Sequence, residues 1–257
     1  MTSTSVASVL PGQATVLACW AALAERSPGA RMVAAPGATA AVFPAVSYLN
    51  NAVLTDLDAL GAALPALTAR YAEAGIASWA VWVPARSPAF DGFTDRCAAV
   101  AGLTRDITTL VMRADIAPDL ESDLRVVRAS YAAVERLALT EQPLPATELG
   151  EPDDIDELAV WALVEDGLAV ASAYTYQRGD DCGVYTVGTI PAYRRRGFGR
   201  ALAAHALADA RTRGARTATL QSTPMGESLY RSLGFRAAGR YEEWVFPGVS
   251  GNSSHRQ

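Results

Sequence analysis

Hydrophobic and polar positions in the first 115 residues form alternating helical and extended patterns. The stretch 14–27 has a helical pattern and ends at Pro28-Gly29, a pair that breaks helices. Further helices are predicted at 57–74 and 94–101, and strands at 31–35, 40–43, 52–55, 77–83 and 108–113. Thr55 and Asp56 are candidate caps of the second helix, and Pro65 lies inside it, where it would kink or restart the helix. Such alternation predicts an α/β sheet.

A second α/β pattern begins at residue 124. Ser130 is a candidate N-cap, and Asp166-Gly167 favours the positive φ angles of a tight hairpin turn. Pro191 ends a run of β-branched and aromatic residues, because it has no N–H to donate to a strand partner. The pattern predicts helices at 131–139 and 201–213 and strands at 124–128, 161–164, 169–176, 182–190, 217–221 and 242–246.

The two patterns are separated by 116–123, a segment with Pro118 and several acidic residues that is the best candidate for a linker. With 257 residues, half of them hydrophobic, the chain is near the upper end for one domain. We therefore predict a first α/β domain at 1–115, a second at 124–248 and a small, polar, flexible tail at 249–257.

Composition excludes some classes of function. The net charge of -5 and the pI near 5.1 argue against a nucleic-acid partner. Three widely spaced cysteines predict neither disulfides nor a metal site. The N-terminus lacks the basic region of a signal peptide, and no apolar run is long enough to span a bilayer. We expect a soluble cytoplasmic protein without a membrane partner, and the oligomeric state stays open.

The connection between the strand at 182–190 and the helix at 201–213 carries the candidate chemistry. It contains Gly197 and Gly199 among four arginines, and all 22 basic residues of the chain are arginine. Two glycines allow positive φ and close backbone approach, a helix start attracts anions, and guanidinium groups bind phosphate. The segment therefore predicts a diphosphate cradle. A Rossmann fingerprint is excluded because Leu202 stands at the third glycine, and a Walker loop because lysine is absent.

Residues 187–199, VGTIPAYRRRGFG, resemble motif A of the GNAT superfamily of acyl-CoA N-acyltransferases. That motif has Gln or Arg, two residues, Gly, one residue, and Gly or Ala, and Arg194, Gly197 and Gly199 fill those places. Residues 228–235, SLYRSLGF, resemble motif B of the same family. The resemblance covers about 124–247 and implies a mixed α/β sheet with splayed central strands. The first half contains no Arg-x-x-Gly-x-Gly, and we interpret it as a smaller, degenerate GNAT-like domain, with an unrelated α/β domain as the alternative.

The resemblance also implies the cofactor and the site. Acetyl-CoA would enter between splayed strands at 169–176 and 182–189, without a metal. Tyr230 matches the position credited with protonating the departing CoA thiolate, although a buried aromatic residue stacked beneath Phe235 is the competing interpretation. Thr223 stands where the family commonly has an asparagine that binds pantetheine. The implied cofactor-binding residues are Val187, Gly188, Thr189, Arg194, Arg195, Arg196, Gly197, Phe198, Gly199, Arg200 and Thr223.

The reaction implied is direct attack of a primary amine of an unidentified acceptor on acetyl-CoA in a ternary complex. A longer acyl-CoA donor, or a CoA-binding sensor or scaffold without activity, are the alternatives. We expect His205 on the surface and without a catalytic role, and Trp79, Trp82, Trp161 and Trp244 in the core. The general base stays open between a water chain and the carboxylates of Glu165, Asp166, Asp180, Asp181, Glu242 and Glu243.

Overall fold

The computed structural model of this chain describes residues 9–85 and 102–246. Its contacts divide the chain into two compact units that are not contiguous in sequence. Unit 1 comprises Met1–Gln13, Leu17–Val111 and Ala237–Gln257, and unit 2 comprises Ala14–Val16 and Met112–Arg236. The last strand of the chain thus groups with unit 1. The boundaries at 115 and 124 stay predictions, and the tail at 249–257 lies outside the described residues.

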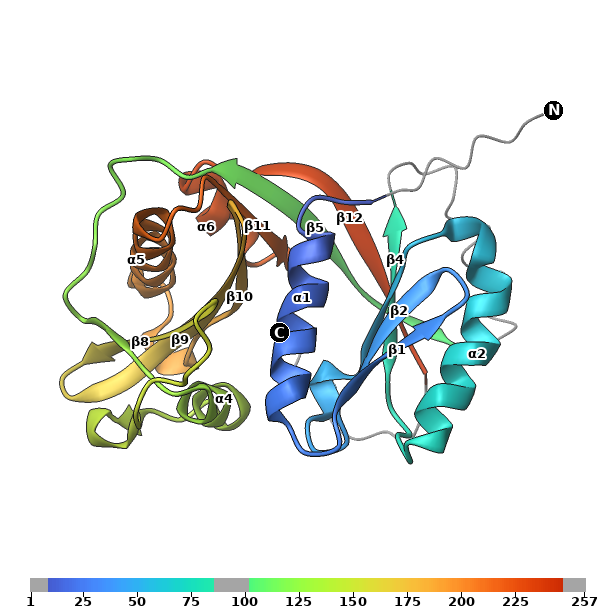
Figure 1. The fold of residues 1–257 in the computed structure, drawn as a ribbon. Helices are drawn as coiled ribbons and strands as arrows, with labels where there is room; N and C mark the ends of the chain where they lie inside the picture. Colours follow the sequence, from blue (N-terminus) through green and yellow to red (C-terminus); the bar gives the residue numbers. More distant parts are fainter. Residues whose placement is uncertain (1–8, 86–101, 247–257) are drawn as a thin grey trace. The chain divides into compact units, whose positions relative to one another are not determined.

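Unit 1 is an α/β unit in which most of α1 (Gln13–Arg26) and α2 (Leu60–Glu73) lie on opposite sides of one sheet (Figure 1). The strands follow the order β1-β2-β3-β4-β12-β5. The parallel pair β3 and β4 is joined through α2, whereas β1–β2, β2–β3 and β4–β12 are antiparallel. These strands are β1 (Arg31–Ala35), β2 (Ala38–Val42), β3 (Asn51–Leu54), β4 (Ala80–Ala85), β5 (Thr104–Asp115) and β12 (Arg236–Val245).

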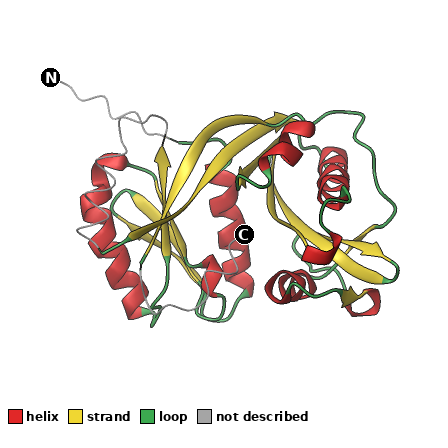
Figure 2. Cartoon of the chain, turned by 180° about the vertical axis from the view of Figure 1, so that it is seen from behind, coloured by secondary structure: helices red, strands yellow, loops and turns green. Residues whose placement is uncertain are grey.

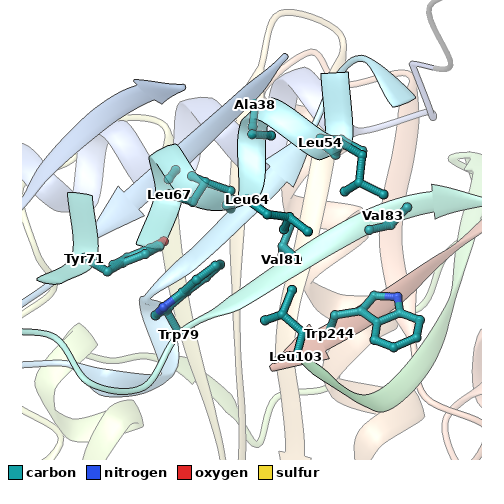
Figure 3. Packing of buried hydrophobic residues seen from close by; sticks show 14 of the residues in the cluster. Ala38, Leu54, Leu64, Leu67, Tyr71, Trp79, Val81, Val83, Leu103 and Trp244 are labelled. Carbon is teal, nitrogen blue, oxygen red and sulfur yellow. The ribbon is translucent and has the colours of Figure 1, made fainter. Parts of the chain in front are cut away.

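The core of unit 1 forms between α2 and the sheet (Figure 3). The ring of Tyr71 stacks on that of Trp79 with centroids 4.9 Å apart. The Tyr71 hydroxyl, fully buried, donates a hydrogen bond to the carbonyl oxygen of Ala41 at 3.0 Å. The burial of apolar side chains here is the main stabilising contribution to the unit. Residues of this cluster include Leu54, Leu64, Leu67, Val81, Val83, Leu103 and Trp244.

Unit 2 contains the part of the mixed sheet with the strand order β11-β10-β9-β8-β6, and the end of β5 lies beside β11. Helices α4 and α5 lie on opposite faces of the strands β8, β9 and β10 (Figures 1 and 2). The elements are β6 (Val126–Arg128), α4 (Tyr131–Thr140), β7 (Leu144–Pro145), β8 (Leu158–Glu165), β9 (Leu168–Arg178), β10 (Asp181–Thr189), α5 (Phe198–Thr212), β11 (Thr217–Ser222) and α6 (Glu227–Ser232).

Local signals in the sequence are confirmed. Ser130 caps α4, because its hydroxyl accepts a hydrogen bond from the Ala133 amide at 3.3 Å. Asp166 and Gly167 have φ of 50° and 75°, as a tight hairpin turn requires. Helix α5 begins at Phe198, earlier than predicted, and Pro65 lies within α2. The predicted helix at 94–101 lies outside the described residues.

The expectation for the last strand needs correction. Glu242 and Glu243 were expected where that strand begins, but they lie well inside β12 and are 2% and 7% exposed. The strand starts earlier, at Arg236, because it lies between β4 and β5, and its pairing with β4 already begins at Arg240. In the part of the chain that the structure describes, no helix is both long and apolar enough to cross a membrane.

Candidate functional site

The strands that diverge in unit 2 are β10 and β11, and not the pair that the resemblance led us to expect. Strands β9 and β10 remain paired from Asp181↔Arg178 to Thr189↔Ala171. The parallel register of β10 with β11 runs only from Asp181↔Thr217 to Gly183↔Thr219, although both strands continue beyond it. The expectation that 169–176 and 182–189 splay apart is therefore wrong. A tight turn fixes the register of β9 against β10, whereas β11 is reached only through α5.

A β-bulge lies on β10 beyond the point of divergence. The register passes from Tyr185↔Tyr174 to Gly188↔Ser172, so β10 carries one extra residue there. Thr186 has a φ of 48°, which is uncommon for a β-branched residue. Beyond the bulge, Val187 and Thr189 are partly exposed and Gly188 is exposed. The segment 187–189 thus belongs to the part of β10 that extends past its register with β11.

The connection from β10 to α5 contains two residues with positive φ at the start of the helix. Arg195 and Gly197 have φ of 66° and 81°, and Gly197 is the N-cap residue of α5. Among the described residues, no side chain caps this helix start, and no atom lies within 4 Å of the position that a Cβ of Gly197 would take. The start of α5 therefore has no side-chain cap and is open beside Gly197, an arrangement that suits the oxygens of a diphosphate.

The arginines of this segment have different surroundings. Arg194 donates from Nε to the carbonyl oxygen of Thr189 at 3.0 Å and pairs with Glu141 at 3.4 Å, so it ties the segment to the end of β10. Arg195, Arg196 and Arg200 are exposed. The guanidinium carbon of Arg196 lies 4.9 Å from the ring centroid of Tyr193. Three exposed cations thus lie around the helix start.

Phe198 and Gly199 shape the packing beneath this helix start. The Phe198 ring is buried, with the guanidinium carbon of Arg125 5.2 Å from its centroid. A Cβ at Gly199 would lie 3.0 Å from Cδ1 of Leu229, a residue of α6. Gly199 therefore allows α6 to pack closely against the start of α5.

Tyr230 lies on α6, and its role as a proton donor stays a prediction. Its ring is 8% exposed and meets Phe235 edge-on, with centroids 5.8 Å apart, rather than stacking beneath it. Burial raises the pKa of the Tyr230 phenol above its usual value, so the hydroxyl keeps its proton. Gly226, which the sequence analysis did not single out, makes room for the ring, because a Cβ there would lie 3.1 Å from it.

Thr223 lies between β11 and α6. Its carbonyl oxygen accepts hydrogen bonds from the Gly226 amide at 3.1 Å and from the Ser222 hydroxyl at 2.8 Å. These bonds hold the turn that leads into α6. Thr223 is partly exposed, and the structure leaves its contact with pantetheine a prediction.

Several candidate bases are engaged in structural contacts. Asp181 lies on β10 and accepts hydrogen bonds from the hydroxyls of Thr217 at 3.0 Å and Thr219 at 2.8 Å. Glu165 pairs with Arg125 at 2.9 Å. Glu242, in unit 1, pairs with Arg105 and Arg240, each at 3.2 Å. The carboxylates that accept these bonds are held in place within their own units. The base stays unassigned.

His205 is not the exposed surface residue expected. Its ring meets that of Trp161 edge-on at 4.9 Å, and its Nδ1 is buried without a partner among the described residues. Desolvation lowers the pKa of His205. Trp79, Trp161 and Trp244 are buried, as predicted, and Trp82 is partly buried.

The corresponding connection in unit 1, between β3 and α2, lacks these features. The amides of Thr55 and Asp56 both donate to the carbonyl oxygen of Gly37, at 2.8 and 3.1 Å. The Asp56 carboxylate accepts from the Asp58 amide at 3.0 Å. Two carboxylates and occupied amides do not suit a phosphate group. Within the described part of the chain, no group of three or more His, Cys, Asp or Glu lies together as a metal site would require.

Part of the sequence and the fold of this chain resemble known proteins. Residues 131–235 match the model of the acetyltransferase (GNAT) family. A GCN5-related N-acetyltransferase from Kribbella flavida has a TM-score of 0.64 at 20% identity, covering 93% of this chain and 97% of that one. A tandem GNAT protein from the clavulanic acid biosynthesis pathway has a TM-score of 0.52 at 13% identity, covering 88% and 86%. A GCN5-related N-acetyltransferase from Sphaerobacter thermophilus has a TM-score of 0.51 at 17% identity, covering 84% and 79%. No curated protein matches the sequence.

These structures share the fold of this chain over most of its length. At 13–20% identity the likeness concerns the fold alone. The mixed α/β fold expected from the sequence is confirmed, with its GNAT-like architecture. The family match supports acyl-CoA-dependent N-acetyltransfer as the general activity.

Proposed function

Because residues 131–235 match the model of the acetyltransferase (GNAT) family, we propose that this protein transfers the acetyl group of acetyl-CoA to a primary amine by direct attack in a ternary complex. The observation that carries the proposal is the divergence of β10 and β11 after Gly183, followed along the chain by an uncapped, glycine-led start of α5. An extended ligand with a phosphate end matches that combination of a strand edge and a helix start.

The backbone around the helix start binds the diphosphate in this proposal. Amides of the first turn of α5 donate to the phosphate oxygens, and the exposed guanidinium groups of Arg195, Arg196 and Arg200 add positive charge. Arg194 holds the segment against Thr189. Backbone groups of Val187, Gly188 and Thr189 bind the pantetheine and the acyl group, and Thr223 contributes from the end of β11.

The proton balance assigns a role to Tyr230. Bound acetyl-CoA supplies a thioester, whose C–S bond breaks as the amine nitrogen forms the new N–C bond. A primary amine with a pKa near 10.4 is neutral in only about one molecule in a few thousand at pH 7, so the acceptor must first lose a proton. A second proton leaves the nitrogen on transfer, and the departing thiolate takes one up. The Tyr230 hydroxyl, kept neutral by burial, is the proposed donor to the thiolate.

The proposal is tested by acetyl-CoA-dependent thiol release over a panel of primary amines, combined with a thermal shift on addition of CoA. Thiol release that depends on the amine, with sequential steady-state kinetics, supports direct transfer. A panel of acyl-CoA donors distinguishes acetyl from longer chains. Stabilisation by CoA without turnover for any amine refutes the enzyme and favours a sensor, and an absence of both effects refutes acyl-CoA binding altogether.

A further inference from the structure

Arg125, the residue before β6, is held in one orientation by two carboxylates. Its Nε and Nη2 donate to the two oxygens of Asp123 at 3.1 and 2.8 Å, and its Nη1 donates to Glu165 at 2.9 Å. Its backbone is fixed as well, because its amide donates to Asp123 at 2.9 Å and its carbonyl oxygen accepts from the Val164 amide at 2.8 Å. A bidentate pair sets the plane of a guanidinium group, although this side chain is 45% exposed.

A series of cation and ring contacts leads from Arg125 to the proposed phosphate site. The Arg125 guanidinium carbon lies 5.2 Å from the centroid of the Phe198 ring, which is 5% exposed. The Phe198 ring lies beside that of Tyr193, with centroids 6.4 Å apart. The guanidinium carbon of Arg196 in turn lies over the Tyr193 ring, 4.9 Å from its centroid. Each distance is within the range of a cation–π or ring–ring contact. We call these four residues the cation–ring series.

Arg196 is the exposed end of the cation–ring series. An exposed arginine side chain samples many rotamers, and ordering it on ligand binding costs free energy. A guanidinium group over a ring uses its face in that contact, and the N–H groups at its edge remain suited to phosphate oxygens. The contact with Tyr193 therefore restricts Arg196 before a ligand arrives and leaves the edge of its guanidinium group for the phosphate.

Arg125 is not itself suited to bind phosphate. All three nitrogens of its guanidinium group donate to carboxylates, and the two negative charges of Asp123 and Glu165 outweigh its positive charge. Its contribution to binding an anion must therefore pass through the ring that its guanidinium group covers.

We propose that Arg125 is a positioning residue for CoA, which acts through Phe198 and Tyr193 to hold the guanidinium group of Arg196 where that group binds a phosphate of CoA. The inference rests on the proposed function, because its ligand is the CoA of that reaction.

Isothermal titration calorimetry with CoA measures the effect of substitutions at Arg125. Arg125→Met keeps an unbranched side chain beside Phe198 but removes the cation, and we expect the Kd for CoA to rise about fivefold. Arg125→Lys keeps the charge but lacks the planar fork that the carboxylates orient, and we expect a similar rise. In acetyl transfer to an amine that the panel identifies, the KM for acetyl-CoA should rise with the Kd, and kcat should stay within twofold, because Tyr230 is not part of the series. An unchanged Kd in Arg125→Met overturns the inference. An unchanged Kd in Arg125→Lys also overturns it, because charge alone would then suffice.

Substitutions at the other end test the route. Tyr193→Leu removes the ring and should raise the Kd as Arg125→Met does, whereas Tyr193→Phe keeps the ring and should leave the Kd within twofold. In the double variant Arg125→Met with Arg196→Met, the Kd should lie within twofold of that of Arg196→Met alone, because Arg125 acts through Arg196. A further fivefold rise in the double variant would show independent effects and would overturn the inference.

The matched control is Arg128→Met. The guanidinium carbon of Arg128, on β6, lies 5.0 Å from the ring centroid of Trp161, which is 4% exposed. This contact is of the same kind, but its ring lies on β8 and not in the segment 194–200. Arg128→Met should bind CoA like the unsubstituted protein, and a rise equal to that of Arg125→Met would overturn the inference.

Thermal unfolding checks that each variant folds, and if Arg125→Met does not fold, Tyr193→Leu compared with Tyr193→Phe makes the same test. Normal CoA binding in Arg125→Met and Tyr193→Leu overturns the inference and leaves the proposed function standing. Lack of CoA binding by the unsubstituted protein overturns both.

Discussion

Gly197 and Gly214 flank the two ends of α5 and provide a matched pair of substitutions. Their φ angles are 81° and 101°, and no described atom lies within 4 Å of the Cβ that either would carry as alanine. The cost of each alanine is therefore conformational and not steric. Placing a non-glycine residue in the left-handed region costs about 1 kcal/mol. We expect Gly197→Ala and Gly214→Ala to lower the Tm by similar amounts, about 2–4 °C each.

The two variants should differ in their response to CoA. The methyl group of Gly197→Ala enters the open space in front of the first turn of α5, where we propose that the diphosphate binds. We expect the Kd for CoA to rise about tenfold, which corresponds to about 1.4 kcal/mol. Gly214→Ala lies at the far end of the helix and should bind CoA like the unsubstituted protein.

Isothermal titration calorimetry measures both affinities, and a thermal shift provides an independent readout. At a CoA concentration of about 100 times the original Kd, binding stabilises the unsubstituted protein by about 2.7 kcal/mol and Gly197→Ala by about 1.4 kcal/mol. The two variants share the same kind of backbone strain and differ only in the position of the substitution. An equal Kd for CoA in both would therefore refute the proposal that the methyl group of Gly197→Ala blocks the phosphate site. The result would then exclude the helix start as the phosphate site.

Three further predictions follow from individual contacts. Tyr230→Phe should lower kcat at least tenfold, measured by steady-state kinetics, and change the Kd for CoA less than twofold, measured by calorimetry. An unchanged kcat would contradict the role of Tyr230 as the acid. Tyr71→Phe removes the buried bond to Ala41 and should lower the free energy of unfolding by about 1 kcal/mol, measured by urea denaturation at pH 7. Because burial raises the pKa of Tyr71 in the folded state, the contribution of the protonated Tyr71 to the free energy of unfolding is present below pH 10 and is lost as the pH rises above it. Tyr71→Phe should therefore also reduce the fall of the free energy of unfolding with pH above pH 10. The same fall with pH in both proteins would argue against this linkage. Ser130→Ala removes the cap of α4 and should cost about 1 kcal/mol by the same assay, and a change below about 0.3 kcal/mol would show that solvent replaces the cap.

Much of the local structure could be predicted because its causes are local. The turn at Asp166-Gly167, the cap at Ser130 and the helix after the arginine segment all depend on residues within one turn of each other. Boundaries were less accurate, as at β12, because strand ends depend on the partner strand.

The candidate site was only partly predictable. Motif spacing identified the glycines that precede and begin α5, because the backbone conformation they permit is a property of the residue itself. No sequence signal pointed to the contact of Arg125 with Phe198 or, elsewhere in unit 2, to the packing of Tyr131 and Tyr185 on Tyr174. The ring contacts of Tyr174 join residues up to 43 positions apart (131 to 174), and the contact of Tyr131 exists only once α4 covers the sheet.

The sequence by itself determined the order and type of most of the described elements, and it predicted the segment where we propose that a phosphate binds. The tertiary structure decided which strands diverge, because the hairpin of β9 and β10 stays paired while β11 leaves the register after Gly183. It also decided that β12 joins unit 1, although the sequence places that strand at the end of the second half. The physical reason is that helix starts, caps and turns depend on residues close together in the sequence, whereas strand pairing depends on contacts between segments that are far apart in the sequence.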